Sequence, residues 1–213
     1  MYLGIDLSIN GTGLCILDND GKIFFTVNLN SIYTKQVKKS HRTVRIACTA
    51  EYIADLIKQH SICFIAKEGY SFGSMRFRGS SSITPLAELN GVVEHYLLKN
   101  DFTEANNNYL IVQPTKVKKF TLSKGNFKKD TAYLLNIYEK TKIRFNTDDE
   151  ADSYMVANLL FHLIRTKKDI SHIKELYDYQ IECILDEDKL KSKKLGLKKW
   201  LKLQDSEKGF YLL

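Results

Sequence analysis

Four acidic residues stand where their carboxylates could act together. Asp6 ends a short apolar segment, YLGID, and Glu68 follows the continuous apolar run at residues 62–66. Asp149 and Asp152 are three residues apart, so on a helix both side chains lie on one face. Carboxylates among buried residues are costly unless they are paired or bound to a metal ion. These positions therefore make the four acids candidates for joint chemistry.

The chemistry that such a group would support is metal-dependent hydrolysis. Neighbouring carboxylates repel one another and suppress ionisation unless a cation compensates. Oxygen ligands of this kind suit hard divalent ions, Mg²⁺ or Mn²⁺. Two such ions could activate water and stabilise the leaving oxygen in phosphodiester cleavage.

Each acid also has an ordinary structural interpretation. Asp6 could begin a turn, and Glu68 could be a solvated strand end. Thr147 and Glu150 have the spacing of a capping box, and acids at a helix start are favoured by the helix dipole. The combined order of two strand-end acids and one helix-face pair favours the catalytic interpretation.

The elements that would position these acids follow an α/β pattern. Hydrophobic patterning predicts strands at residues 2–7, 13–17, 23–29, 62–66 and 109–112. It predicts helices after the basic segment 35–45, from Pro85 to Leu98, and at about 128–140 and 148–165. This order predicts a mixed five-stranded sheet, with three antiparallel strands followed by a βαβ unit, flanked by helices. We expect residues 1–168 to form this domain and residues 169–213 to form a basic helical extension.

Composition narrows the classes of protein to which the chain can belong. The 213 residues carry a formal net charge of +7, and the sequence pI is about 9.1, which favours polyanionic partners. Residues 115–129 contain six lysines and no acid.

No apolar run is long enough to cross a membrane. The four cysteines are widely spaced, so we expect reduced thiols in a cytoplasmic protein rather than a zinc cluster or disulfides.

Several segments resemble the motifs of RuvC-like Holliday-junction resolvases, most closely those of the phage-encoded branch. Residues 3–13, LGIDLSINGTG, resemble the opening GIDxSxxxTG pattern, and residues 64–68, FIAKE, resemble the strand that carries the family's glutamate. Residues 149–153, DEADS, are similar to the closing D-[AE]-A-D-A motif, with Ser153 in place of alanine. Residues 113–129 resemble the family's basic segment. The resemblance covers about residues 1–165.

The resemblance implies a retroviral-integrase/RNase H-like fold and an endonuclease that cuts branched DNA. It implies a homodimer that places paired nicks with two Mg²⁺ ions per active site, for which Mn²⁺ can substitute. The metal ligands would be Asp6, Glu68, Asp149 and Asp152. Further DNA contacts are expected from the basic segment and from the loop after Glu68, at Lys118, Lys119, Lys124, Lys129, Tyr70, Phe72, Arg76 and Arg78.

The roles within that second group differ. Lys118 and Lys129 match family lysines that contact DNA or support the cut phosphate. In some members an aromatic residue shortly after the glutamate stacks on a base. Here Tyr70 and Phe72 flank that point, and Ser71 occupies the closest aligned position.

Other interpretations remain open at this point. The same fold could cut flaps, Y-junctions or replication forks instead of four-way junctions. An actin/sugar-kinase-like phosphotransferase also begins with a strand aspartate and a Gly/Thr/Ser hairpin, but it normally needs two such domains. An inactive nucleic-acid-binding module is the third alternative. The helix from Pro85 is a candidate dimer interface because Leu86, Leu89, Val93 and Leu97 are apolar.

Overall fold

The computed structural model describes residues 1–69 and 80–213, with the side chains of all of these except residues 80–83. Five strands form one sheet in the order β3-β2-β1-β4-β5. They are β1 (Tyr2–Asp6), β2 (Gly13–Leu17), β3 (Ile23–Asn28), β4 (Phe64–Glu68) and β5 (Tyr109–Val112). The first three are antiparallel, whereas β4 pairs in parallel with both β1 and β5. The predicted mixed five-stranded sheet is confirmed.

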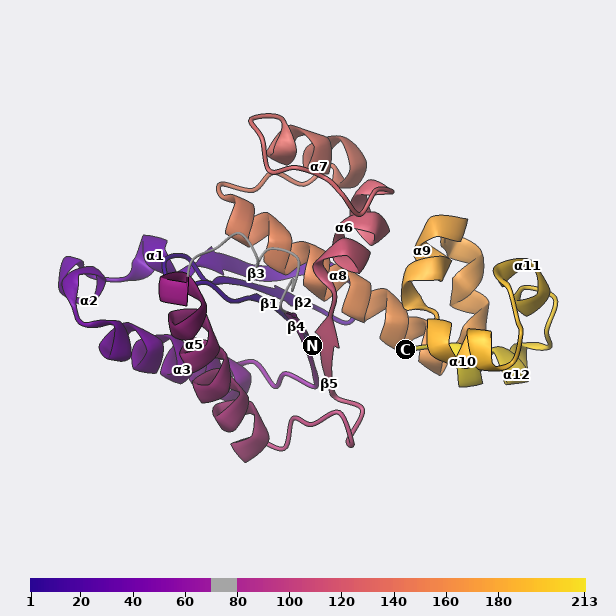
Figure 1. Cartoon of the computed structure of the whole chain (residues 1–213), viewed down its shortest axis with the longest axis horizontal. Coiled ribbons are helices and arrows are strands. Elements are labelled where there is room, and N and C mark those ends of the chain that lie inside the picture. Colours follow the sequence, from indigo (N-terminus) through magenta and orange to yellow (C-terminus); the bar gives the residue numbers. More distant parts are fainter. Residues whose placement is uncertain (70–79) are drawn as a thin grey trace.

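Helices cover both faces of the sheet (Figure 1). On one face, α3 (Arg42–Gln59) and α5 (Ser80–Lys99) pack in a single core with alternate strand residues such as Leu3 and Ile5. The opposite face packs against α8 (Asp148–Lys168). Successive side chains of a strand point to opposite faces, so the central strands are buried on both sides. The continuous apolar runs in the sequence reflect this double burial.

Two glycines bring the start of α8 against the sheet. A Cβ atom at Gly4 would lie 2.2 Å from the carbonyl oxygen of Ser153, and one at Gly13 would lie 1.9 Å from that of Asp149. No side chain fits in either gap. Glycine at these strand positions therefore permits the close approach that sets the first turn of α8 over β1 and β2.

The shorter helices differ from the sequence prediction in two places. The predicted helix at 128–140 is α7, and it begins later, at Tyr133–Thr141. Helix α6 (Pro114–Leu122) lies in the basic segment, where no helix is predicted from sequence. Pro114 occupies its first turn, a position that suits proline. Helices α1 (Leu29–Ile32) and α2 (Lys35–Lys39) connect β3 to α3.

The apolar residues proposed as a dimer interface on α5 face the core instead. Leu89, Val93 and Leu97 are buried against α3, and Leu86 packs at the edge of the same cluster. The helix also begins at Ser80, before Pro85. Burial in the chain's own core explains the apolar pattern of this helix, which therefore does not indicate an interface.

Residues after Lys168 form a series of short helices at one end of the molecule (Figure 1). They are η1 (Ile170–Glu175), α9 (Asp178–Ile184), α10 (Glu187–Ser192), α11 (Leu197–Trp200), α12 (Asp205–Lys208) and η2 (Gly209–Tyr211). The predicted helical character is confirmed. Ile184 and Trp200 are fully buried in the core that also contains α6 and α8. Gln180 donates a hydrogen bond to the carbonyl oxygen of Phe120, at 3.2 Å.

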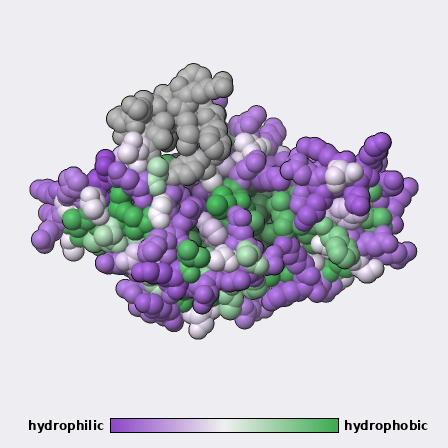
Figure 2. Space-filling model, turned by 60° about the horizontal axis from the view of Figure 1, so that its bottom comes forward, coloured by the Kyte–Doolittle hydropathy of each residue, from purple (hydrophilic) through white to green (hydrophobic). Residues whose placement is uncertain are grey.

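The surface is polar over much of its area. Figure 2 shows a face on which hydrophilic side chains predominate, with hydrophobic ones between them. Among the described residues, no helix is both long enough and apolar enough to span a membrane.

Candidate active site

Sheet topology brings the two strand-end acids together. Strands β1 and β4 are parallel neighbours in which Ile5 pairs with Lys67. The next residues, Asp6 and Glu68, therefore emerge side by side at the carboxyl edge of the sheet. This is the edge at which α8 begins, because the backbone of α8 contacts β1 and β2 at the two glycines.

The start of α8 is held by its capping interactions. The Thr147 hydroxyl accepts a hydrogen bond from the Glu150 N–H at 3.2 Å, as the predicted capping box requires. The Glu150 carboxylate accepts from the backbone N–H of Asn146, at 3.0 Å, rather than from that of Thr147. The helix start is thus fixed, and the predicted placement of Asp149 and Asp152 on one helix is confirmed.

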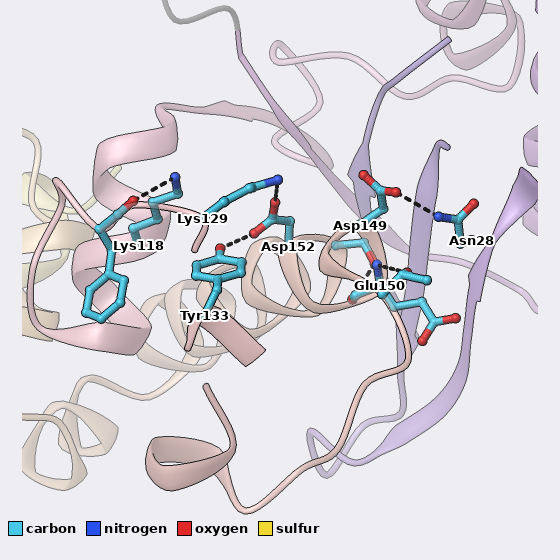
Figure 3. Close-up of polar contacts among 10 residues, drawn as sticks. Asn28, Lys118, Lys129, Tyr133, Asp149, Glu150 and Asp152 are labelled. Carbon is cyan, nitrogen blue, oxygen red and sulfur yellow. Dashed lines mark hydrogen bonds and ion pairs between the residues drawn. The ribbon is translucent and has the colours of Figure 1, made fainter. Parts of the chain in front are cut away.

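Asp152 is buried and has both carboxylate oxygens engaged. Its side chain is 3% exposed. Lys129 forms an ion pair with one oxygen, and the Tyr133 hydroxyl donates to the other (Figure 3). Tyr133 is itself fully buried at the start of α7. Asp152 is therefore held by one cation and one phenol.

Asp149 has a different environment. It is partly exposed, and its Oδ2 accepts a hydrogen bond from the Asn28 side-chain amide at 2.7 Å (Figure 3). The other end of the Asn28 amide accepts from the Asn30 N–H at 2.8 Å and so caps α1. A Cβ atom at Gly11 would lie 2.6 Å from Asp149 Oδ2. Glycine at this position leaves the room that the carboxylate occupies.

The acids interact electrostatically as a cluster. Burial raises the pKa of Asp6 well above its usual value, and Glu68 and Asp152 raise it further. Burial, together with Asp152, raises the pKa of Glu68 to about 7, although Lys129 and Lys118 oppose this. Burial also raises the pKa of Asp149. Burial is thus the largest cause that disfavours the charged form of these three acids.

The acids of the cluster keep Lys129 in its charged form. Burial alone would lower the pKa of its amine, but Asp152, Asp6 and Asp149 outweigh burial and raise that pKa above its ordinary value. The amine therefore stays charged beside the cluster.

The donor chemistry of the cluster fits a hard divalent cation, because all four side chains offer oxygen alone. Within residues 1–69 and 80–213, however, no three His, Cys, Asp or Glu side chains form a ready-made metal-binding group. Lys129 and Tyr133 bond to both oxygens of Asp152, and this keeps Asp152 from joining the other acids in such a group. A cation binding to all four acids would have to compete with Lys129 for Asp152.

The predicted DNA-contacting lysines divide into two groups. Lys118 lies near the acids and donates to the carbonyl oxygen of Phe127 at 3.3 Å, and Lys129 pairs with Asp152. Lys119 instead pairs with Glu182 of α9 at 2.6 Å, and Lys124 is exposed. The remaining predicted contacts lie outside the described residues. They are Tyr70, Phe72, Arg76 and Arg78.

Sequence reasoning missed several residues around the acids. Asn28 and Tyr133 bond directly to Asp149 and Asp152. Lys67, beside Glu68, is 2% exposed and donates to the Asn90 side chain at 2.6 Å. A lysine within an otherwise apolar strand was a visible signal for a buried polar contact. No comparable signal marked Asn28 or Tyr133.

Solved structures match this architecture, whereas no protein-family model and no curated protein matches the sequence. The RuvC of T. thermophilus in complex with a Holliday junction substrate superposes with a TM-score of 0.57 at 13% identity, over 79% of this chain and 95% of that one. The chain has the RuvC fold. A second Thermus thermophilus RuvC structure agrees, with a TM-score of 0.56 at 15% identity, over 78% of this chain and 95% of the other.

A third match is looser. The yeast mitochondrial Holliday junction resolvase Ydc2 superposes with a TM-score of 0.45 at 16% identity, over 85% of this chain and 82% of that one. The two RuvC superpositions confirm the predicted RNase H-like fold. A closer relation to the phage-encoded branch remains a prediction.

Proposed function

We propose that this chain is a structure-selective DNA endonuclease that resolves four-way junctions by metal-dependent phosphodiester hydrolysis. The observation that supports this best is the meeting of Asp6, Glu68, Asp149 and Asp152 at one edge of a RuvC fold. That one of the matching RuvC proteins is in complex with a Holliday junction substrate supports branched DNA as the substrate class.

Mg²⁺ is the proposed cofactor, held by the four carboxylates. Bound there, the metal would supply an activated water and stabilise charge on the leaving oxygen. The protein's own residues prepare the site: Tyr133 orients Asp152, and Asn28 orients Asp149. Lys129 compensates charge in the cluster, and its side chain is 40% exposed.

The basic segment provides the electrostatic part of binding. Lys118 and Lys124 lie on the same segment as Lys129, which contacts the acidic cluster. Each lysine that neutralises a phosphate adds to the salt dependence of the affinity. Tyr70 and Phe72, with Arg76 and Arg78, stay predicted contacts to the junction centre.

A homodimer is proposed because of the symmetry of the substrate. A four-way junction has near two-fold symmetry, and resolving it cleanly needs two nicks on opposed strands. An isologous dimer repeats one active site across the same axis. Each subunit would then cut one strand.

The test is cleavage of synthetic four-way, Y-shaped and linear DNA with Mg²⁺, with the nicks mapped at nucleotide resolution. We expect paired nicks related by the two-fold axis in the four-way junction and little cutting of linear duplex. Asp6→Asn should bind the junction without cutting it. Preferential single nicks in Y-shaped DNA would instead assign the chain to flap or fork cleavage. Undiminished cutting in excess chelator would contradict a metal-dependent nuclease.

A further inference from the structure

A small polar pocket lies beside the acidic cluster. The turn at residues 8–12 forms one side, and residues from α1 to α3, among them Tyr33, Lys38 and Arg45, form the other. In Figure 1 these helices lie together at one end of the sheet. No acidic residue lines the pocket, and two of its lining residues are cations. Its chemistry therefore suits an anion.

Arg45 has an unused donor in this pocket. Its Nη1 donates to the Asn10 side-chain oxygen at 3.1 Å, which directs the guanidinium toward the turn. Its Nε is buried and has no hydrogen-bond partner. Leaving a buried donor unsatisfied is costly, and an anion in the pocket would satisfy it. Arginine binds phosphate oxygens well because its planar group presents several N–H donors in fixed directions.

The positive charges of the pocket have no acidic partner among the described residues. In the part of the chain that the structure describes, neither Lys38 nor Arg45 forms an ion pair. The sequence of residues 70–79, YSFGSMRFRG, contains no acid. Both positive charges are therefore available to a ligand.

The walls of the pocket are braced. The Thr12 hydroxyl donates to the carbonyl oxygen of Ser8 at 2.8 Å and accepts from its N–H at 3.2 Å. On the opposite wall, the Thr49 hydroxyl donates to the Arg45 carbonyl oxygen at 2.9 Å and lies 2.7 Å from the Tyr33 hydroxyl. These bonds indicate a site that is formed before a ligand arrives.

Gly11 separates the pocket from the acidic cluster. It lines the pocket, and a Cβ atom on it would meet Asp149 Oδ2 on the other side. Gly11 therefore lies between the pocket and Asp149.

We propose that this pocket binds a backbone phosphate of the cut strand, adjacent to the phosphate that is hydrolysed. This rests on the proposed nuclease function and adds to it a defined phosphate-binding site. Arg45 Nε and the Lys38 amine donate to the non-bridging oxygens. The contact holds the strand in register with the acids.

The experiment compares Arg45→Gln with Lys58→Gln, a control that removes one exposed charge at the far end of the same helix α3. Junction affinity is measured against salt in chelator, so that binding is separated from cutting. The loss of one positively charged contact in Arg45→Gln should flatten the slope of log affinity against log salt by about 0.9. Lys58→Gln should leave the slope unchanged. Thermal unfolding of both variants checks that the fold is intact, and Lys38→Gln provides a second variant in the pocket.

Junctions with a single neutral methylphosphonate locate the contact. At one position beside the nick, wild-type protein should lose about tenfold in affinity, whereas Arg45→Gln should lose nothing further. Equal losses for both proteins at every position would overturn the proposal. The Arg45 Nε–H resonance should shift when the junction binds. A shift with inorganic phosphate but none with the junction would assign the pocket to free anions and contradict DNA binding there.

The outcomes also separate this proposal from the nuclease assignment. Wild-type protein that binds no branched DNA would contradict both. Wild-type protein that binds and cuts junctions, with an unchanged salt slope and methylphosphonate profile in Arg45→Gln, would contradict the pocket alone.

Discussion

The two ends of the acidic cluster are built differently, although Asp149 and Asp152 are only three residues apart on α8. Asp152 is buried, and an ion pair with Lys129 and a hydrogen bond from Tyr133 engage both its oxygens. Asp149 is more exposed and has a neutral amide, that of Asn28, as its partner. Lys129 neutralises the carboxylate of Asp152, whereas in residues 1–69 and 80–213 no cation is bonded to that of Asp149.

This difference indicates how charge is shared within the site. Lys129 forms an ion pair with Asp152, whereas it acts on Asp6, Glu68 and Asp149 only through its charge, and burial raises the pKa of all three. Helix capping places both α8 acids, but the strands and the α7 segment decide which of them is neutralised. Asp152 and Asp149 lie on one face of α8, yet we expect Asp152 to contribute more to stability than Asp149 does.

The largest expected effect comes from removing each α8 carboxylate in turn. Asp149→Asn and Asp152→Asn should each lower junction cutting at least about 10³-fold, because bound metal contributes several kcal/mol and each 1.36 kcal/mol is a factor of ten. Their stabilities should differ. Asp152→Asn leaves Lys129 without its partner and should lower the free energy of unfolding by about 1–2 kcal/mol, less than for a fully buried pair because Lys129 is part-exposed.

Asp149→Asn removes a carboxylate whose charged form is disfavoured by burial, so the free energy of unfolding should stay level or rise. Single-turnover cleavage and urea unfolding measure both quantities. A greater loss of stability in Asp149→Asn than in Asp152→Asn would show that the two ends of the cluster are not divided as described.

A smaller effect is expected from the residues that orient these acids. Tyr133→Phe keeps the buried ring and removes the hydroxyl, and it should lower cutting by roughly 10–100-fold, the usual range for partners of metal ligands. Asn28→Ser keeps a capping oxygen for α1 while removing the amide donor to Asp149. We expect it to lower cutting by roughly tenfold. Titration of activity with Mn²⁺ separates weaker metal binding from slower chemistry. Equal losses of cutting in Tyr133→Phe and Asn28→Ser would show that the partners of Asp152 and Asp149 matter equally.

A steric change at Gly11 should affect the Asp149 end alone. In Gly11→Ala the new Cβ would lie 2.6 Å from Asp149 Oδ2 and 3.1 Å from the Asn28 amide nitrogen, so the pair must shift. We expect roughly a tenfold loss of cutting, the cost of about 1.4 kcal/mol in the barrier. Gly91→Ala is the control, because no atom lies within 4 Å of its Cβ position on α5. Comparable losses in both would show that the effect is not local to Asp149.

The smallest effect is a dependence of stability on pH in chelator. The folded pKa of Glu68, about 7, is above its ordinary value of 4.5, so the folded protein binds more protons than the unfolded chain between these values. Stability should therefore fall as pH rises through this window, on the order of 1 kcal/mol, with Asp6 acting in the same direction. Urea unfolding from pH 4 to 8 measures this, and Glu68→Gln should reduce the slope. Stability that rises with pH in this range would contradict the raised pKa values.

The order of the strands and helices and the places of the four acids on them could be predicted from the amino-acid sequence. Alternating and continuous apolar segments predicted the sheet, because a strand buried on one face alternates apolar and polar residues and one buried on both faces is apolar throughout. The strand ends placed Asp6 and Glu68, and the three-residue spacing placed Asp149 and Asp152 on one helix. The Thr147 cap was readable for the same reason, since its hydrogen bond spans only three residues.

The hydrogen-bond partners of those acids depend on how distant segments pack. Asn28 and Asp149 are 121 residues apart, and Tyr133 meets Asp152 only because α7 packs beside α8. The pocket likewise depends on the turn at residues 8–12 meeting Arg45 of α3. A single polar contact between distant segments has no period and no fixed spacing in the sequence. Its existence follows from how the elements pack, and packing is set by the whole apolar core rather than by the residues that make the contact.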